Sequence, residues 1–463
     1  MDFHLFPYDI IPRHSNIIVY GAGNVGQEYL EQIEQTNWCV VICFADKDYA
    51  RYKWMKITVR NPEDLFVDAV YDFVVIAIES LEIVDKVKNN LLKMGVPTEK
   101  IINVSERYLE KNRQKSICYD EETEKDDTVK IAYQIVGSMG TYIIYLKLLE
   151  EIVRVCPNCS VDVFCKIGQA KWFYEKHPNV RSLREYNELK SEKDKYDVVL
   201  KIGHVVRLER LFYNKVNRLC PELADKLRRL HDKFLNYYCN LNTHHLKDNL
   251  FIRKAGFLGI NRFTALGHNG IFDLSDKRVN IPLDKNYEDA FNNLKLDKYI
   301  TFNRGAACIP GENREQTKIW PREHFDTFIL EFKSKFPNIK VVQIGAGDLE
   351  KLNGADRHYM GENMELVKYI LKNAVFHLDC EGGLVHLATQ LGTKCIVLFG
   401  PTSLQYFGYE QNINVSTNIC NDCRWIAADW MVNCYRNGEK QICINSIAPE
   451  TVLEKAESVL KSV

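Results

Sequence analysis

Apolar runs that end in glycine and lead into helix-like periodicity recur along this chain and constrain its fold more than any other feature. Three of them read "NIIVYGAG" from residue 16, "VKIAYQIVGSMG" from residue 129 and "TKCIVLFGP" from residue 393. Strands that alternate with helices form parallel sheets whose two faces are covered by helices. The sequence therefore predicts an α/β protein built from doubly wound parallel sheets.

The length of the chain implies more than one domain. Its 463 residues exceed one average hydrophobic core, so two or three domains are expected. The run "EKNRQKSICYDEETEKDD" is highly charged and poor in apolar residues, which favours a linker. We expect a first domain at 1–115, a linker at 116–128, and two further units at 129–288 and 289–463. A hinge between those two units is expected near residues 280–292.

Composition narrows the classes of partner. The formal net charge is -1, so no global field favours nucleic acid, and we expect no nucleic-acid partner. No apolar run reaches the roughly 20 residues that span a bilayer. The N-terminus lacks a signal-peptide pattern, so a cytoplasmic location is expected, with peripheral association at the inner membrane left open. The 15 cysteines are then expected to be thiols or metal ligands.

The first glycine turn, "GAGNVG", has the spacing of a nucleotide-binding loop. Gly21, Gly23 and Gly26 follow a strand and open a helix, and Asp46 ends the next strand. Such glycines let the backbone approach a phosphate, and the acidic residue accepts hydrogen bonds from ribose hydroxyls. We predict a nucleotide site at these four residues; the alternative is a loop kept for packing alone. A third reading of the whole chain, an NAD-dependent oxidoreductase, rests only on this loop and lacks a catalytic set.

Chemistry-bearing residues gather at the expected carboxyl ends of the C-terminal strands, where open parallel sheets bind ligands. A helix that begins near Gly383 aims N–H groups at the same cleft, which suits a diphosphate. Lys318 precedes a helix begun by proline and offers a positive charge for a leaving diphosphate. We predict that this cleft binds a sugar nucleotide, the donor of a sugar group. The predicted donor-binding residues are Asn303, Lys318, Gly345, Asp348, Asp379, Gly382, Gly383, His386, Thr402 and Ser403.

The order of these motifs resembles a known family. Residues 128–463 resemble the heptosyltransferase-like glycosyltransferases of family nine, through "TKIWPREHFDTFI", "VVQIGAGDLE" and "HLDCEGGLVHLATQLGTKCIVLFGPTS". The resemblance implies the two-lobed GT-B fold, with an acceptor lobe at 129–288 and a donor lobe at 289–463. The segment "GAGNVGQEYLEQI" resembles small Rossmann-like domains appended to sugar-modifying enzymes. The fold class expected is therefore three Rossmann-like units.

The same resemblance implies a reaction and residue roles. The family inverts the anomeric centre, needs no metal or other cofactor at the reacting sugar, and commonly uses ADP-heptose. Carried over, Lys318 touches the donor phosphates and Asp379 the donor sugar. Gly382, Gly383 and Thr402 contact the diphosphate, while Asp348 lies near the adenosine ribose.

One departure from the family concerns the general base. The opening turn of the family usually reads Gly-x-x-Gly-Asp, and its Asp removes the acceptor proton, whereas this turn is "GSMGTY". Thr141 stands at the position of the carboxylate, and a hydroxyl is a poor base near neutral pH. His204 is a candidate replacement because it follows a strand that should face the cleft. Glu381, in a turn one residue longer than usual, is the second candidate base or a ligand to sugar hydroxyls.

A cysteine-rich stretch closes the list of candidate sites. Cys420, Cys423, Cys434 and Cys443 lie within about two dozen residues and suit a tetrahedral thiolate site for zinc or iron. Some related heptosyltransferases hold iron here. Free buried thiols are the alternative.

Together these features predict an inverting glycosyltransferase for glycan or lipopolysaccharide synthesis. It would move a heptose-like sugar from a nucleotide-sugar donor to a glycan, a lipid-linked saccharide or a protein. Because Thr141 replaces a carboxylate, the rival hypothesis is a non-catalytic protein that senses nucleotide sugars on the same scaffold.

Overall fold

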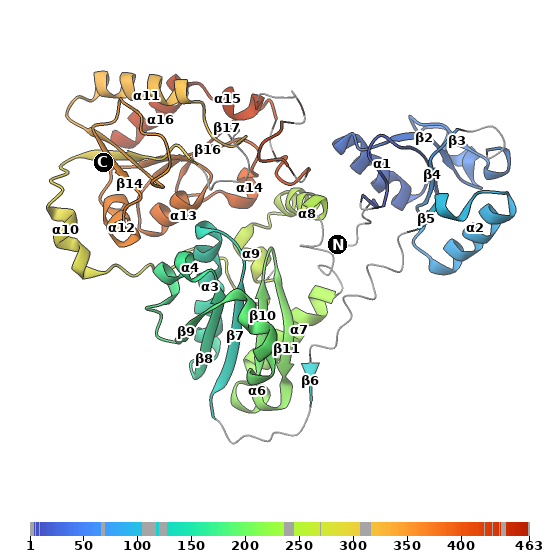
Figure 1. Ribbon diagram of the computed structural model, residues 1–463, viewed down its shortest axis with the longest axis horizontal. Helices are drawn as coiled ribbons and strands as arrows, with labels where there is room; N and C mark the ends of the chain where they lie inside the picture. Colours follow the sequence, from blue (N-terminus) through green and yellow to red (C-terminus); the bar gives the residue numbers. More distant parts are fainter. Residues whose placement is uncertain are drawn as a thin grey trace. The chain divides into compact units, whose positions relative to one another are not determined.

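The computed structural model describes residues 4–461, apart from 5, 9, 66–69, 104–116, 120–126, 236–244, 269, 306–315, 421, 428, 435 and 437–440 (Figure 1). The chain divides into two compact units, of which the first ends at Gln114 and the second begins at Lys115. Most of the predicted linker at 116–128 lies outside the described residues. Its described part includes a short strand, β6 (Ile117–Cys118), which pairs with β11 (Val206–Phe212) of the second unit.

The first unit is a five-stranded parallel sheet with the order β3-β2-β1-β4-β5. Its main helices, α1 and α2, follow β1 and β4. The elements are β1 (Asn16–Tyr20), α1 (Asn24–Thr36), β2 (Val40–Ala45), β3 (Val59–Arg60), β4 (Phe73–Ile76), α2 (Leu81–Lys93) and β5 (Ile101–Asn103). The three strands expected from the apolar runs are present, and β3 and β5 complete the sheet.

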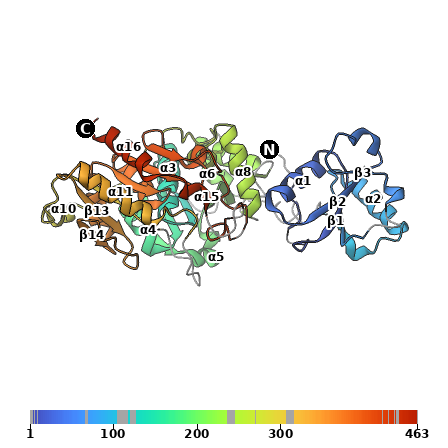
Figure 2. The same cartoon turned by 90° about the horizontal axis from the view of Figure 1, so that it is seen from above.

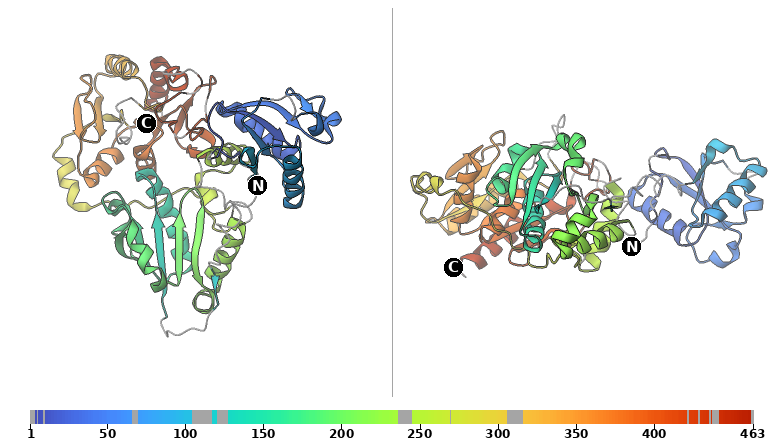
Figure 3. Two further views of the ribbon diagram at one scale, coloured as in Figure 1. Left: turned by 45° about the vertical axis from the view of Figure 1, so that its right-hand side comes forward. Right: turned by 90° about the horizontal axis from the view of Figure 1, so that it is seen from below.

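The second unit begins with a lobe built on a six-stranded sheet, called here the first lobe, with the order β6-β11-β10-β7-β8-β9. Its other strands are β7 (Val129–Ile135), β8 (Cys159–Cys165), β9 (Val180–Glu185) and β10 (Val198–Ile202). Its longer helices are α3 (Met139–Val155), α4 (Ile167–Tyr174), α6 (Tyr213–Leu219), α7 (Pro221–Lys233), α8 (His245–Phe257) and α9 (Arg262–Leu266). In Figure 3 this lobe is coloured teal to yellow-green.

Strand β11 was not expected, because residues 207–265 read as helical. It runs antiparallel to β10, and the register shifts between Val199 and Leu200. Arg210 pairs with Val199 and Leu208 with Leu200, so Glu209 is the extra residue of a bulge. The bulge changes the spacing of the buried residues from two to three, between Leu208 and Leu211. That spacing imitates a helix, which explains the wrong interpretation.

The second lobe of this unit carries a six-stranded, fully parallel sheet with the order β14-β13-β12-β15-β16-β17. The chain order reverses between β12 and β15, and the carboxyl end of such a switch point is where open α/β sheets bind ligands. The strands are β12 (Tyr299–Phe302), β13 (Lys340–Gly345), β14 (Arg357–Met360), β15 (His377–Cys380), β16 (Cys395–Phe399) and β17 (Ile413–Ser416). The helices are α10 (Glu288–Asn292), α11 (Arg322–Lys335), α12 (Met364–Lys372), α13 (Gly383–Gln390), α14 (Leu404–Phe407), α15 (Ile442–Asn445) and α16 (Pro449–Leu460).

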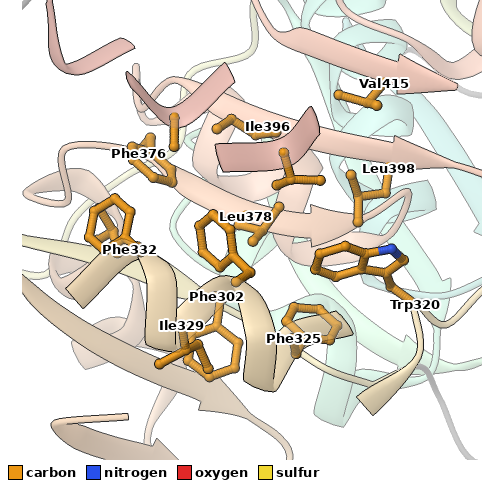
Figure 4. Close-up of a cluster of buried hydrophobic side chains, with 14 of the residues drawn as sticks. Phe302, Trp320, Phe325, Ile329, Phe332, Phe376, Leu378, Ile396, Leu398 and Val415 are labelled. Carbon is orange, nitrogen blue, oxygen red and sulfur yellow. The ribbon is translucent and has the colours of Figure 1, made fainter. Parts of the chain in front are cut away.

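The core of the second lobe lies between its sheet and the pair α11 and α16, which pack side by side (Figure 2). Trp320 is fully buried there beside Phe325 and Leu398 (Figure 4). Its indole Nε1 donates to Ile447 O at 2.8 Å, and its backbone N donates to Cys380 Sγ at 3.3 Å. The tryptophan thus joins the turn that carries Lys318 to the end of β15. The expected mixed α/β architecture with mostly parallel sheets is confirmed.

In the first unit, two glycines pack against each other at the start of α1. Gly21 has φ +111°, a conformation that favours glycine, and a Cβ at Gly26 would overlap Gly21 O. We predict that Gly26→Ala destabilises this unit by about 2 kcal/mol or more, because the backbone must move. Hydrogen exchange of the β1 and α1 amides measures the loss.

Gly23→Ala is the matched control for this prediction. Gly23 has φ -71°, and no atom lies within 4 Å of the position a Cβ would take. Exchange rates in β1 and α1 should remain near those of the wild type. Equal acceleration in both variants would contradict the packing explanation.

Candidate functional site

A cleft of about 320 Å³ opens between the two lobes of the second unit. Its walls come from the turns after β7, β10 and β15, from the starts of α3 and α13, and from Arg262, Lys318, Phe407, Arg424 and Trp425. Strands β7 and β10 are parallel neighbours, with Ile135 paired to Ile202, so the turns that follow them emerge side by side. The cleft therefore lies where the carboxyl ends of strands from both sheets meet.

Two helices begin at this cleft and approach each other closely. A Cβ at Gly140 would overlap the His386 ring, and a Cβ at Gly383 would lie 2.9 Å from Met139 Cε and 3.3 Å from Gly140 N. Glycine at both positions thus allows α3 and α13 to meet end to end (Figures 1 and 3). The first N–H groups of each helix lack intrahelical partners and carry partial positive charge. This arrangement favours an anion in the cleft.

Three cationic side chains line the same cleft: Lys318, Arg262 and Arg424. The turn that carries Lys318 is fixed by Thr317, whose N donates to Met431 O at 2.7 Å and whose Oγ1 donates to Trp430 O at 2.9 Å. Lys318 Nζ donates to Glu381 O at 3.4 Å.

Arg262 is buried and held by neutral oxygens. It donates to His204 O at 2.7 Å, to Tyr145 Oη at 2.8 Å and to Gly203 O at 2.9 Å. Arg424 instead lies over aromatic rings, 4.1 Å from the centroid of Trp425 and 4.6 Å from that of Phe407. Both guanidinium groups are therefore fixed in place before any ligand binds.

Glu381 is the carboxylate among the residues that line the cleft. His386 Nε2 lies 3.6 Å from its Oε1, and Arg424 Nη1 lies 3.7 Å from its Oε2. Burial raises the pKa of Glu381, but His386, Arg424 and Lys318 outweigh it and lower the pKa to about 2. A carboxylate so stabilised is a weak base, so Glu381 suits an ion-pairing or ligand-binding role better than proton abstraction.

His204 enters the cleft at the end of β10. Its Nε2 lies 3.6 Å from Asp248 Oδ2 on α8, and its ring packs edge-on against Trp425 with centroids 4.3 Å apart. Burial, followed by the charges of Arg262 and Arg424, lowers the pKa of His204 well below its usual range. The imidazole is therefore neutral at pH 7.

A second polar cluster lies at the switch point of the second lobe. Asn303 Nδ2 donates to both Asp379 oxygens at 3.2 and 3.0 Å, and His377 Nε2 lies 3.5 Å from Asp379 Oδ2. Asp379 is only 2 % exposed, and burial raises its pKa against the opposing effects of His377 and Asn303. Gly345 lies beside this cluster, since a Cβ there would be 3.0 Å from Asn303 Oδ1.

The structure thus divides the predicted site residues into two groups. Those that line the cleft are Thr141, His204, Lys318, Glu381, Gly382, Gly383 and His386. Asn303, Gly345 and Asp379 form the neighbouring cluster, Asp348 is exposed beyond β13, and Thr402 and Ser403 are buried outside the cleft lining. Roles for this second group stay predictions.

Three charged residues of the site were not predicted from sequence: Arg262, Arg424 and Asp248. Arg262 and Asp248 fall in residues 207–275, where the sequence shows helical periodicity but no motif that indicates a functional residue. Arg424 directly follows Cys423, so its stretch was interpreted for its cysteines alone. Asn249 Nδ2 donates to Arg424 O at 2.7 Å, which ties α8 to this loop. Only the folded chain brings these residues together.

In the predicted nucleotide site of the first unit, the Asp46 carboxylate accepts hydrogen bonds from nearby backbone N–H groups. Asp46 Oδ2 accepts from Ala22 N at 2.9 Å, within the glycine loop, and Oδ1 accepts from Asp48 N at 2.8 Å. Packing accounts for Gly21 and Gly26, as described above. Nucleotide binding at Gly21, Gly23, Gly26 and Asp46 stays a prediction.

The four cysteines of the predicted metal site lie near one another. Burial, with Cys443, Cys420 and Cys434 nearby, raises the pKa of Cys423 to about 12. Cys443 is buried and the other three are half-buried. Within the described part of the chain, no group of three or more His, Cys, Asp or Glu side chains has the geometry of a metal site. Zinc or iron binding therefore stays a prediction.

Two parts of the chain match known families. Residues 13–102 match the family described as C2185-like, N-terminal, and residues 246–432 match glycosyltransferase family 9 (heptosyltransferase). No curated protein matches the chain. The second match covers α8 to Val432, and so includes Lys318, Glu381 and Arg424. This part of the chain is thus similar to family 9, as the motifs predicted.

Several solved structures are similar to this chain over part of its length. A family 9 glycosyltransferase from Veillonella parvula is 17% identical, covers 72% of this chain and 98% of its own, and gives a TM-score of 0.47. ADP-heptose LPS heptosyltransferase II of E. coli is 13% identical, with 72% and 99% covered and a score of 0.45. The iron-containing dodecameric glycosyltransferase TibC of enterotoxigenic E. coli is 14% identical, with 72% of this chain and 78% of its own covered and a TM-score of 0.47.

Among the described residues, every helix is too short or too polar to traverse a bilayer.

The depressed pKa of Glu381 links the stability of the site to pH. A carboxylate whose pKa falls from 4.5 unfolded to about 2 folded contributes stability above pH 4.5 and loses it as pH falls towards 2. We predict that Glu381→Gln costs about 3 kcal/mol at pH 7 and that this difference shrinks below pH 4.5. Denaturant unfolding at several pH values measures the difference.

Glu454→Gln serves as the control for this linkage, because Glu454 is exposed on α16. Its unfolding curve should follow that of the wild type at every pH. A Glu381→Gln difference that stayed constant from pH 7 to pH 3 would argue against the ion-pair explanation.

Proposed function

We propose that the second unit is an inverting glycosyltransferase that transfers a heptose-like sugar from a nucleotide-linked donor, with ADP as the leaving group. The match of residues 246–432 to glycosyltransferase family 9 supports the class of reaction. The acceptor is a glycan, a lipid-linked saccharide or a protein side chain, as in glycan or lipopolysaccharide synthesis.

The charge of the cleft is the observation that carries this proposal. Among the lining side chains, Lys318, Arg262 and Arg424 contribute three positive charges and Glu381 one negative charge, a balance of +2 from these four groups. The first N–H groups of α3 and α13 add partial positive charge. A nucleoside diphosphate carries about two negative charges in its sugar-linked form, so a donor would neutralise this surplus.

In the reaction, an acceptor oxygen attacks the anomeric carbon while the bond from that carbon to the β-phosphate oxygen breaks. Negative charge then grows on the departing diphosphate. Lys318 and the two arginines are fixed close to that position, and such preorganised charge lowers the barrier without reorganisation of solvent. The positive side chains provide this stabilisation, so the proposal requires no metal ion at the reacting sugar.

The buried Asp379 takes a supporting role in this proposal. Its carboxylate is occupied by Asn303 and His377, so it orients Asn303 at the switch point. The amide then faces the region next to Gly345, where the nucleoside of the donor would lie.

A second function, nucleotide-sugar binding without turnover, is favoured by one observation. Thr141 lines the cleft where a carboxylate base is expected, and its hydroxyl does not deprotonate an acceptor efficiently at pH 7. The two functions differ in a single measurable product, free nucleoside diphosphate.

A donor panel separates these functions. The protein is incubated with ADP-, UDP- and GDP-linked sugars and a mixture of glycan and lipid-linked acceptors, and released nucleoside diphosphate is measured beside equilibrium binding of ADP. Release of ADP from one donor supports the transferase. Binding without release supports the sensor, and neither binding nor release overturns both.

Lys318 should contribute directly to donor binding. We predict that Lys318→Met weakens ADP binding by about tenfold or more, because a charged hydrogen bond to phosphate is lost. The loss should be smaller at high salt, where the wild type also binds more weakly. Titration calorimetry with ADP measures both effects.

Lys333→Met is the control for this variant. Lys333 lies on α11, pairs with Asp356 Oδ1 at 2.6 Å and is remote from the cleft lining. Its ADP affinity should equal that of the wild type. Full affinity in Lys318→Met would remove this lysine from the donor site.

A further inference from the structure

The cleft lacks a carboxylate at the turn after β7, but the neighbouring strand supplies another group. Thr141 lies in the first turn of α3, the helix that follows β7, and His204 lies in the turn after β10. Because β7 and β10 pair in parallel, both turns open into the same cleft and both residues line it. An imidazole that follows the adjacent strand thus lines the same cleft as Thr141.

Asp248, on α8, gives this histidine a charged partner. Its Oδ2 lies 3.6 Å from His204 Nε2, and the side chains are only 10 % and 13 % exposed. α8 carries Asp248 and is joined to the loop of Arg424 by Asn249, which donates to the carbonyl oxygens of Asp422 and Arg424. The carboxylate is therefore held in place by an element other than the one that carries the histidine.

The remaining neighbours keep the imidazole in position and neutral. Trp425 packs edge-on against the ring, and Arg262 donates to His204 O. In the described part of the chain, the charged groups that face His204 include Asp248 from α8, Arg262 from α9 and Arg424 from the loop after β17. Burial and the two arginines disfavour the imidazolium, whereas the carboxylate stabilises the imidazolium that forms when a proton arrives.

We propose that His204 is the general base of this cleft and that Asp248 is its positioning residue, together replacing the carboxylate missing at Thr141. This inference rests on the proposed transferase function. The acceptor O–H bond breaks and its proton moves to the imidazole of His204. The acceptor oxygen bonds to the anomeric carbon, and the carbon–oxygen bond to the diphosphate breaks with its electron pair.

The first test removes the base and supplies it again from solution. His204→Ala and His204→Gln should lower the rate of ADP release at least a hundredfold while ADP affinity changes less than threefold. Added imidazole should restore part of the rate in His204→Ala and none in His204→Gln, because only the smaller side chain leaves room. His177→Ala, in the same lobe but outside the cleft lining, should match the wild type.

The second test concerns Asp248 and uses a readout that a purely structural role would not move. Asp248→Asn should lower the rate and shift the acidic limb of the pH–rate profile to lower pH, since loss of the carboxylate destabilises the imidazolium. Asp248→Glu should recover part of the rate. An unchanged acidic limb in Asp248→Asn would overturn the pairing.

A third measurement tests the pairing of His204 with Asp248 without requiring enzymatic activity. Histidine labelled with ¹³C in the ring is titrated by NMR in the whole protein, with the His204 signal assigned from His204→Gln. Asp248→Asn should move the His204 titration to lower pH, and an unmoved titration refutes the dyad. If no donor releases ADP, the transferase proposal fails, and this titration still decides the pairing. Full ADP release by His204→Gln would exclude His204 as the base while leaving the transferase intact.

Discussion

The close approach of α3 and α13 is the contact on which the site depends. Gly140 and Gly383 face each other across the lobes, and a side chain on either would collide with His386 or Met139. Their meeting brings the turns after β7, β10 and β15 to one cleft, and it places two helix N-termini at the same point. The predicted glycine turns were thus correct in position, but the sequence could not show that two of them touch.

Positive side chains outnumber negative ones around that contact. Burial lowers the pKa of Arg424, Glu381 opposes this effect, and Arg262 adds to it. Arg262 itself is surrounded by carbonyl and hydroxyl oxygens, which do not neutralise its charge. The like charges of Arg262 and Arg424 therefore repel each other. Burying like charges costs free energy that an anionic ligand recovers on binding. An anionic ligand in this cleft would therefore stabilise the folded protein.

Sequence reasoning succeeded where a residue has a regular place relative to a strand and failed where packing overrides local pattern. His204 and Glu381 lie in the turns after β10 and β15, and Lys318 lies in the turn before α11, so local patterns located them near the ends of elements. Strand β11 was missed because the bulge at Glu209 breaks its alternation. Arg262 and Arg424 escaped notice because their importance comes from long-range contacts, which local sequence patterns do not encode.

The surroundings of Thr141 explain why a base would move to another strand. Gly137 has φ +153°, and a Cβ there would lie 2.7 Å from Thr141 Cβ and Cγ2, so the threonine side chain packs closely against the turn. A β-branched side chain suits this position because it has few rotamers and no extended polar end. Once that side chain serves packing, proton transfer falls to a group on the neighbouring turn. His204 has the required position, and Asp248 supplies the charge that a lone buried imidazole needs in order to accept a proton.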